Sequence, residues 1–157
     1  MLMTRRKMKS RNAFTIVEVM IAAAIVFIAI IGTSANRYGA TLNARRADLH
    51  ATAVRTALLL CEGWNGTCGS TSFNPDNTFS SGLDIIASEG PDAPDGFTTL
   101  GSYRIMLEGV EYYATLSWEN AETDLRALSV IVSWDPSGQG QSAAKSYQLI
   151  TYVENPS

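Results

Sequence analysis

Apolar residues follow two different periodicities along this chain, and the change between them divides the sequence. Residues 14–31 form an almost continuous apolar run in which Glu18 is the single charged residue. Residues 33–60 keep their apolar side chains within one arc at a helical spacing, which is the pattern of an amphipathic helix. Beyond residue 100, β-branched and aromatic residues alternate with polar ones, as in half-buried strands. The pattern predicts a long N-terminal helix followed by a C-terminal sheet.

The predicted helix has two halves with different surroundings. At about 1.5 Å per residue, residues 14–31 span roughly 27 Å, close to the hydrocarbon thickness of a bilayer. Five basic residues and no acidic residue precede this run (Arg5, Arg6, Lys7, Lys9 and Arg11), and such a flank stays on the cytoplasmic side. The second half, residues 32–62, has an apolar stripe composed of Ala35, Tyr38, Leu42, Leu49, Ala53, Ala57 and Leu60. We expect a membrane-spanning half, then a half that packs on a folded head, with Gly63 ending the helix.

The remaining residues, 63–157, are expected to form an extracytoplasmic globular head. Residues 63–100 are rich in Gly, Ser, Asn, Asp and Pro, and predict a variable loop region with short strands or helical turns near residues 83–87. Residues 101–157 predict an antiparallel meander, with Trp118 and Trp134 in the core. Its strands are expected at residues 102–107, 112–118, 125–134 and 146–153. The expected fold class is therefore α+β, with about four strands packed on the second half of the helix.

Charge is distributed unevenly between the two ends of the chain. The net charge of −3 combines the basic N-terminal flank with a strongly acidic head. From Gly63 onward there are twelve acidic residues against three basic ones (Arg104, Arg126 and Lys145), a net charge of −9. Such a head repels phosphate backbones, so the charge argues against a nucleic-acid partner.

Glu18 is the residue that a plain membrane anchor does not explain. A carboxylate near the centre of a spanning helix costs on the order of 2.5–3.5 kcal/mol, and less near the interface. Either Glu18 lies at headgroup level, or it needs a buried positive partner. Cleavage between Ala13 and Phe14 would create such a partner, the new α-amino group of Phe14, in the same chain or in a packed neighbour.

The residues Ala13, Phe14, Thr15 and Glu18 resemble the type IV prepilin signature. In that family a short basic leader ends in a small residue, and a hydrophobic stalk helix opens with a Phe-Thr-x-x-x-Glu-like sequence. Ala13 stands here where the family prefers Gly. A looser resemblance at the other end is to minor pilins and pseudopilins, whose last strands and Gly-rich loop are similar to residues 130–153.

The resemblance implies how the chain is processed and assembled. A prepilin peptidase would remove the leader, residues 1–13, and methylate the amine of Phe14. Glu18, with Thr15 beside it, would then pair with the Phe14 terminus of an adjacent subunit and set the axial register. The partners implied are the peptidase, other pilin or pseudopilin subunits and an inner-membrane assembly platform. The location implied is the inner membrane, in a single pass, and then a pilus or pseudopilus.

The function expected from this resemblance is a structural subunit, and a minor one, of a type IV pilus or a type II secretion filament. A membrane-anchored binding or adhesion domain that does not polymerise is the main alternative, and it predicts an uncut leader. A secreted protein cut after the apolar run is a third, and it predicts a mature start near Asn36.

Other chemistry-bearing residues give weaker signals. In an extracytoplasmic head, Cys61 and Cys68 favour a disulfide, the alternative being two unpaired thiols with Cys61 buried. A structural zinc site needs four ligands, and His50 is the one histidine, so no metal or other cofactor is expected. The remaining motifs are a glycosylation-type sequon at residues 65–67 and an acidic cluster, Asp84, Glu89, Asp92 and Asp95, without calcium-loop spacing. None of these residues forms a recognisable catalytic set, so no enzymatic activity is expected.

Overall fold

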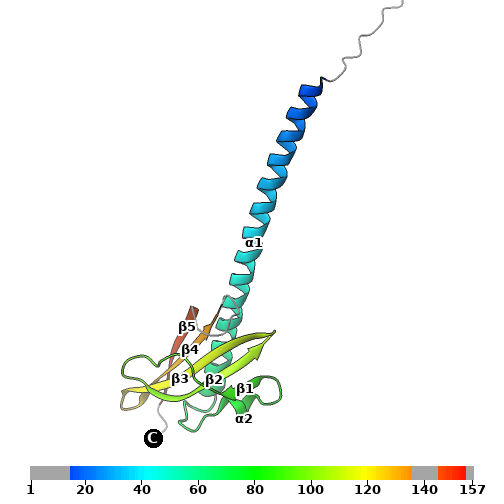
Figure 1. Cartoon of the computed structure of the whole chain (residues 1–157). Coiled ribbons are helices and arrows are strands. Elements are labelled where there is room, and N and C mark those ends of the chain that lie inside the picture. The colour runs from blue at the N-terminus through cyan, green and yellow to red at the C-terminus, as the bar shows by residue number, and fades with distance from the viewer. Residues whose placement is uncertain (1–14, 136–144, 155–157) are drawn as a thin grey trace, which may run out of the picture. The chain divides into compact units, whose positions relative to one another are not determined.

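The computed structural model describes residues 15–135 and 145–154 (Figure 1). Its elements in chain order are α1 (Ile16–Asn65), α2 (Pro75–Phe79), β1 (Asp84–Ala87), β2 (Thr98–Leu107), β3 (Val110–Glu122), β4 (Leu125–Trp134) and β5 (Lys145–Glu154). The predicted α+β class is confirmed, with one long N-terminal helix and a C-terminal antiparallel sheet. Contacts divide the chain into two compact units, Met1–Asn43 and Ala44–Ser157, which are described separately.

In the N-terminal unit, residues 16–31 of α1 are apolar on every side apart from Glu18, and each of them is exposed. From Ile16 to Ile31, each Ile, Val, Met and Phe side chain is more than half exposed. α1 is the one helix in the described part of the chain that is long and apolar enough to cross a membrane. Tyr38 and Leu42, predicted to lie on a packed stripe, are 70% and 37% exposed, while the side chain of Ala35 lies outside the described residues. The packed part of the stripe therefore begins at Leu49.

In the C-terminal unit, the sheet is a simple meander with the order β1-β2-β3-β4-β5, and every neighbouring pair is antiparallel. About four strands were expected, and the structure has five. The additional strand, β1, lies in the predicted loop region at the place where a short element was expected. It is only four residues long, too short for residue alternation to reveal it.

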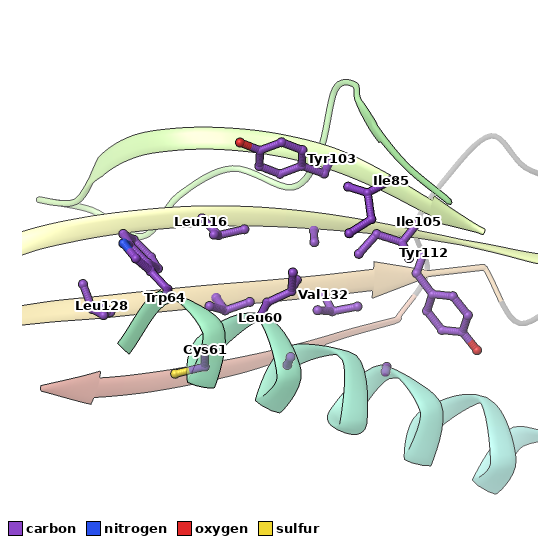
Figure 2. Close-up of a cluster of buried hydrophobic side chains, with 14 of the residues drawn as sticks. Leu60, Cys61, Trp64, Ile85, Tyr103, Ile105, Tyr112, Leu116, Leu128 and Val132 are labelled. Carbon is purple, nitrogen blue, oxygen red and sulfur yellow. The ribbon is translucent and has the colours of Figure 1, made fainter. Parts of the chain in front are cut away.

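The core of this unit lies between the sheet and the last turns of α1 (Figure 2). Leu49, Ala53, Ala57 and Leu60 are buried as predicted. They belong to one buried cluster with Leu116 of β3 and with Leu128, Val130 and Val132 of β4. Trp134 is buried in the same cluster and Trp118 is partly buried against it, as expected for core tryptophans.

The outer face of the sheet is more buried than the residue pattern indicated. Thr115, Ser117 and Ser129 point away from α1, yet each is almost fully buried. Gly90 explains part of this, because a Cβ atom there would lie 2.5 Å from Oγ1 of Thr115. The loop before β2 therefore lies directly on β3, and a polar surface pattern did not reveal this cover.

The end of α1 differs from the prediction that Gly63 would stop the helix. α1 continues to Asn65, and Gly63 lies inside it, where a Cβ atom would be 2.6 Å from Cζ of Phe79. Gly63 thus permits close packing of α2 on α1. In the turn after α1, Cys68 and Gly69 have φ angles of 53° and 65°, and the Gly69 amide donates to the Trp64 carbonyl at 3.1 Å.

Substituting Gly69 with alanine is expected to destabilise the head by about 2–4 kcal/mol. Its positive φ disfavours a side chain, and an added Cβ would lie 2.6 Å from Cγ2 of Val153. Urea unfolding of the full chain in detergent, followed by tryptophan fluorescence, measures the loss. Gly82→Ala is the matched control because nothing lies within 4 Å of a Cβ atom there, and an equal loss in both variants would contradict this role for Gly69.

Candidate assembly site

The first turn of α1 joins Thr15 to Glu18. The Glu18 amide donates to the Thr15 carbonyl at 3.0 Å and approaches the Thr15 hydroxyl oxygen at 3.4 Å. Thr15 thus occupies the N-cap position, and Glu18 is the third residue of the helix, which is the spacing of a capping box. A negative charge in this turn is also favoured by the partial positive charge of the helix N-terminus. The predicted assembly role joined the same two residues, and their Thr-x-x-Glu spacing is the sequence signal of this N-terminal cap.

The Glu18 carboxylate is exposed and has no ion-pair partner within residues 15–135 and 145–154. The predicted cleavage and methylation site, Ala13 and Phe14, lies outside the described residues. The structure therefore places Glu18 one turn into an exposed apolar helix, with its carboxylate available to a charge supplied from elsewhere.

The predicted disulfide between Cys61 and Cys68 is absent from the structure, where both are free thiols. Cys61 is on the last turns of α1 and belongs to the core cluster, with 6% of its surface exposed. Cys68 is exposed, in the turn that follows the helix. Because α1 extends past Gly63, the helix keeps Cys61 on its packed side while the turn carries Cys68 to the surface.

The two thiols are expected to differ in reactivity. Burial, and to a lesser degree the nearby Glu62 carboxylate, raise the pKa of Cys61 above its usual value. Since the thiolate is the nucleophile, iodoacetamide at pH 8 should label Cys68 at least about tenfold faster than Cys61. Peptide mapping by mass spectrometry measures both rates, and labelling of urea-unfolded protein should make them equal. Protection of both cysteines until a reductant is added would contradict the free-thiol arrangement.

The other candidate residues do not converge on a reactive centre. His50 lies edge-on to the rings of Trp134 and Tyr147, at centroid distances of 5.8 and 5.9 Å, as a helix residue packed on the sheet. Among the described residues, no three His, Cys, Asp or Glu side chains are grouped so that they could hold a metal ion. In the predicted sequon, Asn65 ends α1 and the Thr67 hydroxyl donates to the Trp64 carbonyl.

A buried arginine that the sequence analysis did not single out holds the turn after α1. Nη1 of Arg126 donates to the Gly69 carbonyl at 2.8 Å, and its guanidinium lies 4.6 Å from the centre of the Trp118 ring. Nε also donates to Asn120. Arg126 thus joins β3, β4 and the turn after α1, a structural role that no local motif could have revealed.

Comparison with known proteins gives one match. A family model described as the prokaryotic N-terminal methylation motif matches residues 8–34. This range contains Ala13, Phe14, Thr15 and Glu18 and the whole apolar run. No curated protein and no solved structure matches the chain.

Proposed function

Because residues 8–34 of this chain carry the type IV prepilin-like signature, we propose that it is a subunit of a type IV pilus or of a type II secretion filament. The observation that carries the proposal is the coincidence of this motif with the first turn of a long, unpacked apolar helix. The family of the motif is structural and not enzymatic, and the proposed function is assembly.

Processing is the first step of the proposed function. A prepilin peptidase removes residues 1–13 on the cytoplasmic side and methylates the amine of Phe14. The exposed apolar side chains of α1 support membrane insertion of the precursor, because a helix that is apolar all round must be buried in lipid or among other helices. The head then lies outside the inner membrane.

Assembly is the second step. The apolar half of α1 packs among the corresponding helices of neighbouring subunits, and Glu18 pairs there with the Phe14 amine of one neighbour. A buried carboxylate with a single partner suits a role in axial register. Thr15 supports that role, since its hydrogen bond with the Glu18 amide orders the turn that carries the carboxylate.

We further propose a minor subunit, which works with other pilin or pseudopilin subunits and with an inner-membrane assembly platform. This assignment rests on the resemblance of the chain's C-terminal end to minor pilins and pseudopilins. Quantitative mass spectrometry of sheared filaments tests it. A ratio well below one copy per ten subunits supports a minor subunit, and a dominant share contradicts it.

The N-terminal mass of the protein from its native membrane or filament fraction tests the proposed function as a whole. The expected chain begins at N-methylated Phe14. A chain that begins at Met1 or Met3 would contradict the proposal and favour an anchored domain that does not polymerise. A start near Asn36 would indicate secretion.

A further inference from the structure

The sheet of the head has two edges, formed by β1 and β5. β5 pairs with β4 along ten residues, from Glu154 opposite Leu125 to Lys145 opposite Trp134. On its other side, no strand within residues 15–135 and 145–154 pairs with it. β5 therefore presents a row of main-chain hydrogen-bonding groups that matches another extended strand.

β5 lacks the features that usually prevent such pairing. It contains no proline, its register with β4 has no bulge, and its two charges, Lys145 and Glu154, are at its ends. Val153 is buried on the side that faces α1, so Ile150 and Tyr152 point to the opposite side, where they are 46% and 60% exposed. An unprotected strand with exposed apolar residues indicates an interaction surface.

The opposite edge has a matching feature on the same face. In β1, Ile85 is buried in the core and Ile86 points away from α1, with 47% of its surface exposed. Both edges of the sheet thus present an isoleucine on the outer face. If the β5 edge of one copy is placed beside the β1 edge of another, with the outer faces of both sheets on the same side, Ile150 of the first copy lies near Ile86 of the second.

A filament requires a contact that can be repeated. Pairing of β5 with a second β5 is isologous and closes after two copies, whereas a contact between two different surfaces can propagate. We propose that, wherever two copies of this chain are neighbours in a filament, the β5 edge of one copy binds the β1 edge of the other, so that the two heads share one continuous sheet. The inference rests on the proposed function, because filament assembly is what brings copies together with the same polarity.

The topology determines the direction of this pairing. Successive strands of the meander are antiparallel, so β1 and β5 run the same way and meet in parallel when two copies have the same orientation. With Ile86 beside Ile150, Asp84 lies beside Gln148 and no like charges are opposed. Only the four residues of β1 take part, which is far less than a stable dimer needs. The contact therefore forms where the packing of α1 already holds copies together.

Cysteine cross-linking tests the pairing in filaments from cells that overproduce this chain, so that copies of a minor subunit become neighbours. In a Cys68→Ser background, Ile86→Cys and Ile150→Cys are introduced singly and together, and copper phenanthroline oxidises the filament fraction. Neighbouring strands are about 4.8 Å apart, within the Cα range of a disulfide. The double variant should give a ladder of oligomers, each single variant only monomers, and the co-expressed single variants only dimers. Met106→Cys with Ile150→Cys is the control, since Met106 is exposed on the same face but one strand further from the edge.

Each of the other possible cross-linking results would contradict the proposed β5–β1 pairing. Dimers of the Ile150→Cys variant alone would show β5 pairing with β5 and overturn the inference. A chain that is found in filaments with a Phe14 start but gives no ladder would overturn it while leaving the proposed function intact. A ladder of equal strength in the Met106 control would also overturn it. A chain that never enters filaments would overturn the proposed function together with this inference.

Discussion

Replacing Glu18 with alanine is expected to reduce incorporation of the chain into filaments by roughly a hundredfold or more, while membrane insertion persists. Removing one partner of a buried ion pair costs about 3–5 kcal/mol, because the other charge stays buried and unpaired. The charge left behind here is the proposed Phe14 amine of a neighbour. Insertion should improve slightly, since the apolar run loses its one charge. Immunoblots of the sheared filament fraction and of the membrane fraction measure the two effects separately.

A Glu18→Gln variant separates the two roles that the structure permits for this residue. Glutamine can take the place of glutamate in a capping box, so the first turn of α1 stays ordered while the charge is lost. If Glu18 acts by pairing with an amine, Glu18→Gln should fail to assemble as Glu18→Ala does. Normal assembly of Glu18→Gln would contradict the charge-pairing role, and capping of the first turn of α1 would then be the remaining role of Glu18. Glu62→Ala is the control, because Glu62 is an exposed acid on the same helix and should assemble normally.

Replacing Trp64 with alanine is expected to cost the head about 3–5 kcal/mol of folding free energy, a large part of the stability of a small domain. Trp64 is fully buried between α1 and the sheet (Figure 2). Its ring stacks on Phe73 at a centroid distance of 6.1 Å, and its Nε1 donates to the Ser70 carbonyl at 2.9 Å. The substitution thus leaves a cavity and removes the hydrogen bond to the loop after α1. Urea unfolding of the full chain in detergent, followed by circular dichroism, measures the loss.

Two variants divide this effect into its parts. Trp64→Phe keeps an aromatic ring but removes the N–H donor to the half-buried Ser70 carbonyl, so it should cost about 1 kcal/mol. Leu59→Ala is the helix control, because Leu59 is 39% exposed on the other side of α1, and its cost should stay below about 1 kcal/mol. A loss for Trp64→Ala no larger than for Leu59→Ala would show that Trp64 does not hold the loop to the core.

The features that could be predicted from the residues are those that depend on local periodicity and local chemistry. The apolar run with one carboxylate identified the helix and its motif, because both lie within a few turns of one helix. The strands β2 to β5 were predicted by residue alternation, which holds wherever one face of a strand packs and the other does not. Helical spacing placed Leu49, Ala53, Ala57 and Leu60 on the packed side of the helix, but it also included Tyr38 and Leu42, which are exposed.

The features that depend on contacts between residues distant in sequence could not be predicted and are visible only in the fold. Gly63 was predicted to end α1, but it lies inside the helix, where the missing side chain leaves room for Phe79. The disulfide predicted from the short spacing of Cys61 and Cys68 is absent, since α1 continues and holds one thiol in the core. Arg126 joins Trp118 and Gly69 across three segments, and the loop before β2 lies over Thr115 on the outer face of β3. Each of these features depends on which distant side chains come into contact when the chain folds. The spacing of residues along the sequence carries no information on those contacts.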